Sequence, residues 1–316
     1  RNTFPWSNEI TFTVNRCINN DNICPSGCNP EEDNNCNEFV LGEAGLAVGL
    51  ENDSWYPISL NSDIYVEDPL VFTTTQTTNG LENPSSAHIR SVSKEGFETQ
   101  HCEYDSWECD RHLPEDNGWI SVDPGKVENL PGIDAGKIIL SGNNVKQVNF
   151  NKDFDEEPLV FTEVITNNGD VPINSRVISK SSESVSIKLC EQDSEAGCNP
   201  NHPEEEIAWL AIEPLADKQD IFDWGIVDVD QNSWEQVGFT TSFNSPPILI
   251  VETQTKIGVQ DDLIAEADKV NVSGAFVRYC EARGDNECDW HLTEEVAWLA
   301  VKQGELNVVG VKDLSE

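Results

Sequence analysis

The chain is poor in positive charge. Its 316 residues include 19 lysines and arginines against 58 aspartates and glutamates, which gives a formal net charge of −39. Nucleic acids and anionic membrane surfaces are held by clustered basic residues, so this composition excludes both as partners. No apolar run approaches the roughly 20 residues that a membrane-spanning helix needs, and we expect no insertion into a membrane.

Catalytic signatures are also missing. The sequence contains no Gly-x-Ser-x-Gly, no His-Glu-x-x-His, no phosphate-binding loop and no Gly-x-Gly-x-x-Gly after a strand. Carboxylates are abundant, but no pair stands out as the two acids of a glycosidase. We therefore expect that the protein is not an enzyme.

The acidic excess has two interpretations. It predicts a solvated surface that keeps a secreted protein soluble, or a chain adapted to salt or to divalent cations that screen its self-repulsion. Methionine is absent, and no basic region followed by an apolar region is visible after Arg1. We expect that a signal peptide has been removed and that the protein is extracellular or on the cell surface.

The chain contains one sequence pattern three times, with a period of about ninety residues. Cys-Glu is followed by a second cysteine, a histidine, a glutamate three residues after the histidine and a tryptophan seven residues after it. The members are Cys102, Glu103, Cys109, His112, Glu115 and Trp119; Cys190, Glu191, Cys198, His202, Glu205 and Trp209; and Cys280, Glu281, Cys288, His291, Glu294 and Trp298. So regular a period indicates three copies of one module.

Each copy also contains an apolar strand that begins at a proline, namely Pro69, Pro158 or Pro247. Segments rich in β-branched residues alternate with Asn-Gly, Asn-Asp and Pro-containing turns, which is typical of strands. The best short helical candidate is Asp261–Lys269. We predict an all-β fold of three tandem antiparallel β-sandwich modules, at residues 38–130, 131–217 and 218–316, after a disulfide-rich segment at residues 1–37.

The ten cysteines lie in local sets, four in the N-terminal segment and one close pair in each repeat. Such pairs predict disulfides in an oxidising compartment. Metal binding by thiolates is the alternative, but the pairs in the repeats lack the two-residue spacing of zinc knuckles. The disulfide candidates are Cys17, Cys24, Cys28, Cys36, Cys102, Cys109, Cys190, Cys198, Cys280 and Cys288.

The N-terminal segment holds a strand, Glu9–Val14, that belongs to none of the three repeats. We expect it to complete the first sandwich or to add to the edge of a neighbouring molecule. The four cysteines that follow predict a disulfide knot with three alternative pairings. No cofactor is required by the sequence, and calcium is the candidate; its ligands would be Asp21, Glu31, Glu32 and Asp33.

The repeated polar cluster consists of Glu103, His112, Glu115, Glu191, His202, Glu205, Glu281, His291 and Glu294. One hypothesis is structural: the histidine bonds to a glutamate and ties its loop to the returning strand. The others are a divalent-cation site and a contact with a ligand. The tryptophan of each repeat alternates with small and aliphatic residues, which favours a core position over a sugar-stacking platform.

The second copy carries a resemblance. Its strand Pro158–Phe161, the Asn168-Gly169 turn, the strands 175–179 and 185–190, and His202 and Glu205 before the strand 208–213 are similar to H-type-lectin-like repeats of secreted microbial proteins. The resemblance covers about residues 42–127, 136–214 and 225–304.

That family binds N-acetylgalactosamine-type sugars between the subunits of a trimer, through aromatic, histidine and arginine residues. The resemblance therefore implies a β-sandwich, and three copies in one chain could imitate the trimer. The chain departs from the pattern, because Arg176 has no counterpart in the third copy, where residues 265–268 read Ala-Glu-Ala-Asp. Sugar binding is therefore not carried over residue by residue.

Two functions follow as hypotheses. The first is a non-enzymatic structural protein that assembles with copies of itself into an extracellular filament or surface layer, through its tandem modules and the N-terminal strand. The second is an adhesin for cell-surface glycans, with Trp107 and Trp290 as stacking candidates and calcium as a cofactor. Asn52 and Asn271 begin sequons for N-glycosylation.

Overall fold

The computed structural model describes residues 36–311, except for a set of short internal stretches. These stretches are residues 52–53, 80–84, 104–112, 170–171, 192–198, 215, 217, 219, 231–232, 256–262, 283–287 and 290–291. Nearly all of the N-terminal segment predicted to hold the disulfide knot therefore lies outside the described residues. Within the described part of the chain, no helix is long and apolar enough to cross a membrane.

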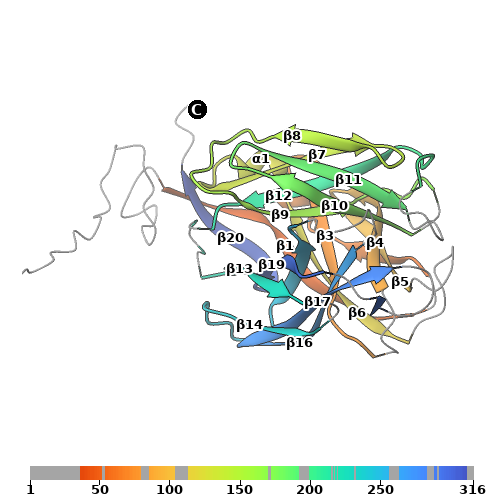
Figure 1. Cartoon of the computed structure of the whole chain (residues 1–316). Helices are drawn as coiled ribbons and strands as arrows, with labels where there is room; N and C mark the ends of the chain where they lie inside the picture. Colours follow the sequence, from red (N-terminus) through yellow and green to blue (C-terminus); the bar gives the residue numbers. More distant parts are fainter. Residues whose placement is uncertain are drawn as a thin grey trace, which may run out of the picture.

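The described chain is all-β, as predicted, and its strands fall into three groups in sequence order (Figure 1). Group 1 contains β1 (Cys36–Leu50), β2 (Tyr56–Ser59), β3 (Leu70–Thr75), β4 (Ser85–Ser93), β5 (Gly96–Glu103) and β6 (Glu115–Val122), with a 3-10 turn η1 (Ser62–Ile64). Group 2 follows a short helix, α1 (Pro124–Val127), and contains β7 (Ile133–Leu140), β8 (Val145–Asn149), β9 (Leu159–Val164), β10 (Ile173–Lys180), β11 (Ser184–Glu191) and β12 (Glu205–Ile212).

Group 3 contains β13 (Phe222–Val229), β14 (Glu235–Gly238), β15 (Ile248–Thr253), β16 (Leu263–Asn271), β17 (Gly274–Ala282), β18 (Cys288–Asp289) and β19 (Glu294–Val301). The last strand, β20 (Gly304–Val311), lies in the third predicted module but pairs with β1 of group 1. The helical expectation for residues 261–269 is wrong, because most of that segment forms β16 and pairs with β17. Cross-strand pairing overrides a weak local pattern.

Each group contributes two antiparallel sheets with the same order of strands. The inner sheets are β1-β6-β3, β7-β12-β9 and β13-β19-β15, and β20 extends the first of them beyond β1. The outer sheets are β2-β5-β4, β8-β11-β10 and β14-β17-β16. In Figure 1, the strands of group 2 lie along the top and those of group 3 at the lower left.

The central strands of the inner sheets, β6, β12 and β19, are buried on both faces. In β12, Ile207, Trp209 and Ala211 point into a core between the two sheets of group 2. The alternate residues Ala208, Leu210 and Ile212 point into a second core that all three groups share. The strand β19 divides its residues in the same way. This explains why the central inner strands read as nearly continuous apolar runs, as strands covered on both faces do.

The repeated tryptophans are core residues. Trp119, Trp209 and Trp298 are 9%, 3% and 6% exposed. A glycine faces each of them on the neighbouring strand: Gly45, Gly136 and Gly225, respectively. A Cβ at these glycines would lie 2.5–2.9 Å from an atom of the indole ring, so a glycine leaves the room that the ring fills.

Candidate functional site

The second glutamate of each repeated cluster ties two strands of its own group together. Glu115, Glu205 and Glu294 are 1%, 1% and 0% exposed, and each accepts a hydrogen bond from a threonine hydroxyl just after the third strand. The threonines are Thr77, Thr166 and Thr255. Each threonine oxygen then accepts the backbone N–H of the residue after the glutamate, at 2.8–2.9 Å. We call this arrangement the Thr-Glu tie.

The predicted histidine contact is present where the structure describes it. His202 Nε2 lies 3.0 Å from Glu205 Oε1, and both side chains are fully buried. Gly169 makes room for the ring, since a Cβ there would lie 2.4 Å from His202 Cε1. In group 2 the geometry therefore has the form of the structural hypothesis. The counterparts His112 and His291, and the side chains of Glu103, Glu191 and Glu281, lie outside the described residues.

The third tie includes a partner from another group. In groups 1 and 2, the remaining oxygen of Glu115 or Glu205 accepts a backbone N–H from Asn79 or Asn168, at 2.6 and 2.7 Å. In group 3, the equivalent donor, residue 257, lies outside the described residues, and the remaining oxygen of Glu294 accepts a hydrogen bond from Arg176 of group 2, at 3.2 Å. A tie that holds one group together thus also contacts a neighbouring group. Among the described residues, no group of three His, Cys, Asp or Glu side chains is arranged to hold a metal ion.

A second repeated carboxylate was not identified from the sequence. Glu43, Asp134 and Asp223 each stand two residues before the glycine that faces the tryptophan, and this spacing was the available signal. Each accepts a backbone N–H from the loop after the second strand of its group. Burial raises the pKa of Asp223, but hydrogen bonds from Lys218, Thr241 and Thr240 outweigh it and hold the pKa below its usual value.

The first cysteines of the repeats occupy equivalent buried positions. Cys102, Cys190 and Cys280 are disulfide-bonded and at most 2% exposed. The side chains of the predicted partners Cys109, Cys198 and Cys288 lie outside the described residues, so the pairing stays a prediction.

The cysteines also show which residues of the outer sheets correspond in the three groups. Cys102, Cys190 and Cys280 face Ser86, Asn174 and Ile264 on the neighbouring strands. The residue two places further on is His88 in group 1, Arg176 in group 2 and Glu266 in group 3. The structure thus places an acidic residue where the third copy lacks the arginine.

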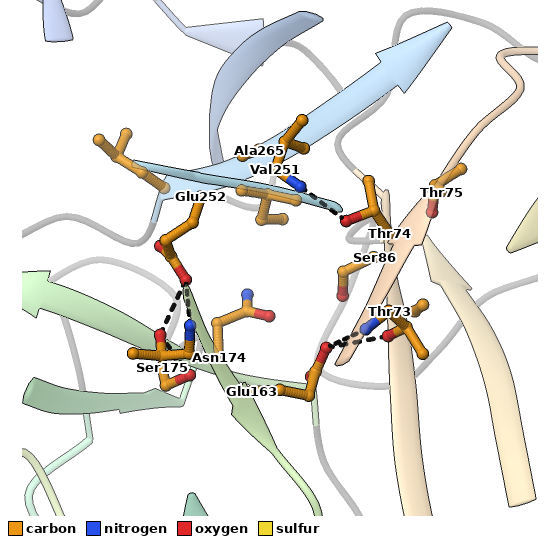
Figure 2. A pocket seen from close by; sticks show the side chains of 14 residues that line it. Thr73, Thr74, Thr75, Ser86, Glu163, Asn174, Ser175, Val251, Glu252 and Ala265 are labelled. Carbon is orange, nitrogen blue, oxygen red and sulfur yellow. Dashed lines mark hydrogen bonds between the residues drawn. The ribbon is translucent and has the colours of Figure 1, made fainter. Parts of the chain in front are cut away.

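The three groups meet at a polar cavity that the sequence did not predict (Figure 2). The cavity has a volume of about 50 Å³. Its wall is built from β3, β9 and β15, the inner edge strands, together with residues of β4, β10 and β16. Side chains that point into it include Thr74, Glu163, Asn174 and Glu252.

Hydrogen bonds pass around this cavity from one group to the next. The backbone N–H and hydroxyl of Thr73 both donate to Glu163 Oε2, at 2.9 Å each. The N–H and hydroxyl of Thr162 donate to Glu252 Oε2, at 3.2 and 2.8 Å.

The third step closes the circle. The N–H of Val251 donates to Thr74 Oγ1, at 3.1 Å. Acceptors and donors occupy the same two positions of β3, β9 and β15, so the contacts run from group 1 to 2, from 2 to 3 and from 3 to 1. We call this set of contacts the axial ring.

Two glutamines form a second layer of contacts between the groups. Gln76 Nε2 donates to the carbonyl of Leu249 at 3.0 Å. Gln254 exchanges two hydrogen bonds with the backbone of Val160, at 2.6 and 2.9 Å. At the equivalent position of group 2 stands Ile165, which packs into the shared core. The contacts between groups therefore follow a threefold pattern with one substitution.

The two carboxyl groups of the axial ring titrate far from their ordinary range. Burial raises the pKa of Glu163 to about 8 against the opposing hydrogen bonds from Thr73, and the nearby Glu252 raises it further. Burial likewise raises the pKa of Glu252 to about 8, although hydrogen bonds from Thr162 and the charge of Arg176 oppose this. Within the described residues, neither carboxylate forms an ion pair.

Two tryptophans near the surface each stack against an arginine. The guanidinium of Arg90 lies 4.1 Å from the ring centroid of Trp55, and that of Arg278 lies 4.5 Å from that of Trp234. Trp55 and Trp234 are partly exposed and directly precede the equivalent strands β2 and β14. An aromatic ring stacked with a cation is a favourable contact of about 0.5–2 kcal/mol.

Among the other predicted site residues, Asn271 is described by the structure. Asn271 is exposed at the turn between β16 and β17, where its side chain accepts hydrogen bonds from Ser273. The remaining candidates lie outside the described residues: Trp107, Trp290, Asp21, Glu31, Glu32, Asp33 and Asn52.

Comparisons with known proteins add no relative. No family model matches the chain, and neither does any curated protein or solved structure.

Proposed function

We propose that the chain is a non-enzymatic structural protein of the cell exterior, built from three tandem sandwich modules of the H-type-lectin kind. In this proposal the three modules stand in for the subunits of a trimer, and whole chains assemble into a filament or surface layer. The observation that carries it is the use of the repeated polar residues. Glu115, Glu205 and Glu294 are buried and bonded to their own strands, which is how residues that hold a module together behave.

The axial ring supports the trimer-like part of the proposal. It joins each group to the next through equivalent positions of three equivalent strands, and it closes on itself. The shared core adds apolar residues from all three groups. A closed set of equivalent contacts is the arrangement of a cyclic trimer, here within one chain.

The assembly part rests on the strand Glu9–Val14 and on an open edge. Among the described strands, β20 pairs with β1 on one side only and ends its sheet. Glu305 and Asn307 on β20 are exposed, while Leu306 and Val308 point into the core. An edge strand of this kind can accept an added strand through its backbone groups.

Removal of residues 1–16 tests the assembly. We expect the full chain to form particles larger than one chain in electron micrographs and in sedimentation, and the truncated chain to remain monomeric with unchanged circular dichroism. A parallel sample with a calcium chelator separates the N-terminal strand from calcium as the cause. Assembly that survives the truncation would overturn this part of the proposal.

The alternative function is a glycan-binding adhesin, and the stacked pairs Trp55–Arg90 and Trp234–Arg278 favour it. The partly exposed ring of each pair suits the apolar face of a sugar, and the partly exposed Arg90 adds a donor for its hydroxyls. A glycan array probed with and without calcium tests it, with Trp234→Ala and Trp55→Ala as the variants. Absence of binding under both conditions would dispose of this function.

A further inference from the structure

The axial ring is unusual in where it places its acids. Two of its three acceptors are carboxyl groups, Glu163 and Glu252, and both border one cavity of about 50 Å³. Each accepts an N–H and a hydroxyl from the neighbouring group through a single oxygen. The third acceptor, Thr74, carries no charge. Two of the three steps of the axial ring therefore run through acids that border the same small cavity.

The strands around the cavity offer these acids little compensating charge. β3 has no titratable residue, and Glu163 and Glu252 are the titratable residues of β9 and β15. On β4, burial lowers the pKa of His88 to about 4, which leaves the imidazole neutral at pH 7. The other charged residues of β4, β10 and β16 lie in ion pairs with other partners: Arg90 with Glu98, Arg176 with Glu294, Lys180 with Glu157, Glu266 with Arg278, and Asp268 with Lys269. Of these, Arg176 also acts on Glu252, and its charge opposes the rise in the pKa of that acid.

The protonation state of Glu163 and Glu252 determines whether the axial ring carries negative charge. A neutral carboxyl group still accepts hydrogen bonds from Thr73 or Thr162 through its carbonyl oxygen, and it brings no charge into the cavity. Two ionised carboxylates would border the same small cavity, and their repulsion would act across the contacts between groups. Loss of the protons therefore opposes the closed ring.

We propose that the axial ring is a proton-controlled latch, which holds the three strand groups together while Glu163 and Glu252 are neutral and loosens when they ionise. This inference concerns the cohesion of one chain and does not depend on the proposed function. In a secreted protein, it makes the compact form most cohesive in acidic surroundings, less cohesive in neutral ones and least cohesive in alkaline ones.

The sign of the effect follows from the direction of the shift. The pKa values of both acids in the folded chain, about 8, lie above the ordinary value of 4.5. Their protonated forms are favoured by the fold, so the stability that they contribute is fully present below pH 4.5. It falls as the pH rises towards 8 and is lost above that. The equilibrium for opening should increase by up to about 10-fold per pH unit for each acid in this range.

Infrared spectroscopy of the unmodified chain gives the first test. We expect the carbonyl band of protonated carboxyl groups to be present at pH 7 and to disappear between pH 7 and 9. A spectrum at pH 7 without this band would overturn the proposal, and this outcome does not depend on whether any variant folds.

The double variant Glu163→Gln/Glu252→Gln gives the second test. An amide keeps the acceptor oxygen but cannot ionise, so hydrogen exchange of β3, β9 and β15 should become insensitive to pH between 6 and 9 beyond its intrinsic chemistry. The matched control Glu156→Gln/Glu183→Gln makes the same two substitutions at exposed positions and should keep the pH dependence of the original chain. An equal pH dependence in all three proteins would overturn the latch.

Added calcium or sodium separates a proton from a cation. We expect neither ion to restore protection from exchange at pH 9 in the original chain beyond its effect on the double variant. Restoration that is specific to the original chain would mean that the two acids hold a cation, and the latch would then be wrong.

Discussion

The Thr-Glu tie within each strand group and the axial ring between the groups use the same chemistry. In both, a carboxyl group accepts hydrogen bonds that fix a threonine hydroxyl or a neighbouring strand. The tie has threonine and glutamate in all three groups, as in Thr166 and Glu205. The ring has different residues at each step: its acceptors are Thr74, Glu163 and Glu252, and its donors are Thr73, Thr162 and Val251.

The difference between the tie and the ring follows from where the partners of each residue lie. The threonine and the glutamate of the tie meet each other in every copy, because both lie within the copy, although Glu294 also bonds to Arg176 of group 2. A residue on the axis meets a neighbour from another copy, and that neighbour differs at each of the three steps. Contacts within a module therefore repeat with the sequence, whereas contacts between modules can each take their own form. In the axial ring, a single chain can therefore carry different residues at the three equivalent contacts, whereas the identical subunits of a trimer cannot.

Loss of a tie should be the most damaging change. Glu205→Ala removes the acceptor of Thr166, of the Asn168 N–H and of His202 in a fully buried position. We expect the free energy of unfolding to fall by about 3 kcal/mol, because buried donors are left without partners. Urea unfolding at pH 7 measures this.

The adjacent residue supplies the control for that change. Glu206 pairs with Lys137 at 3.1 Å, and both side chains are more than a third exposed. Glu206→Ala should cost at most about 1 kcal/mol, as exposed ion pairs do. Similar losses for Glu205→Ala and Glu206→Ala would remove the distinction between the tie and its exposed neighbour.

Loss of a ring acceptor should cost less and should depend on pH. Glu163→Ala removes two hydrogen bonds between groups 1 and 2, and we expect a loss of about 1–2 kcal/mol at pH 5, where the acid is neutral. At pH 9 the original chain has itself lost the stability that the protonated acid contributes, so the difference between the two proteins should shrink. Thermal unfolding at both values of pH measures it. An equal loss at pH 5 and pH 9 would contradict the protonated state.

The sequence predicted the contacts within the modules better than those between them. The ninety-residue period and the spacing of His202, Glu205 and Trp209 indicated strands and a buried tryptophan, because the partners lie close by in the same copy. The Thr-Glu tie was half predicted: the glutamate was singled out, whereas its partner Thr166 looked like an ordinary strand residue.

The contacts between copies left no local signal. Residues 73–75 and 162–164 read Thr-Thr-Thr and Thr-Glu-Val, which is ordinary for a strand, and Glu163 becomes a partly buried acid only when β3, β9 and β15 come together. Pairing of β20 with β1 joins residues more than 250 positions apart, and no turn or period marks it. At Asp261–Lys269 the local pattern was misleading, because pairing with β17 decides the structure there.

The smallest expected effect concerns the donors of the axial ring, which are not the same at all three contacts. Thr73 and Thr162 donate a hydroxyl as well as an N–H, whereas the equivalent Val251 donates its N–H alone. Thr73→Val places valine at the contact between groups 1 and 2, as at the contact between groups 3 and 1. The variant keeps the N–H bond to Glu163 and loses one hydroxyl donor. We expect the free energy of unfolding at pH 5 to fall by about 0.5–1 kcal/mol, the usual net contribution of one hydrogen bond.

The pH dependence makes this last comparison sharper. A carboxylate that loses a hydroxyl donor is less well stabilised in its ionised form, so the pKa of Glu163 in Thr73→Val should rise further, and its titration should move to higher pH. The reverse change, Val251→Thr, adds a hydroxyl beside the uncharged Thr74 and should leave the titration of Glu163 unchanged. Infrared titration of the two variants separates these outcomes. A shift of equal size in both would mean that the acids respond to the cavity as a whole and that the individual steps of the ring are not distinct.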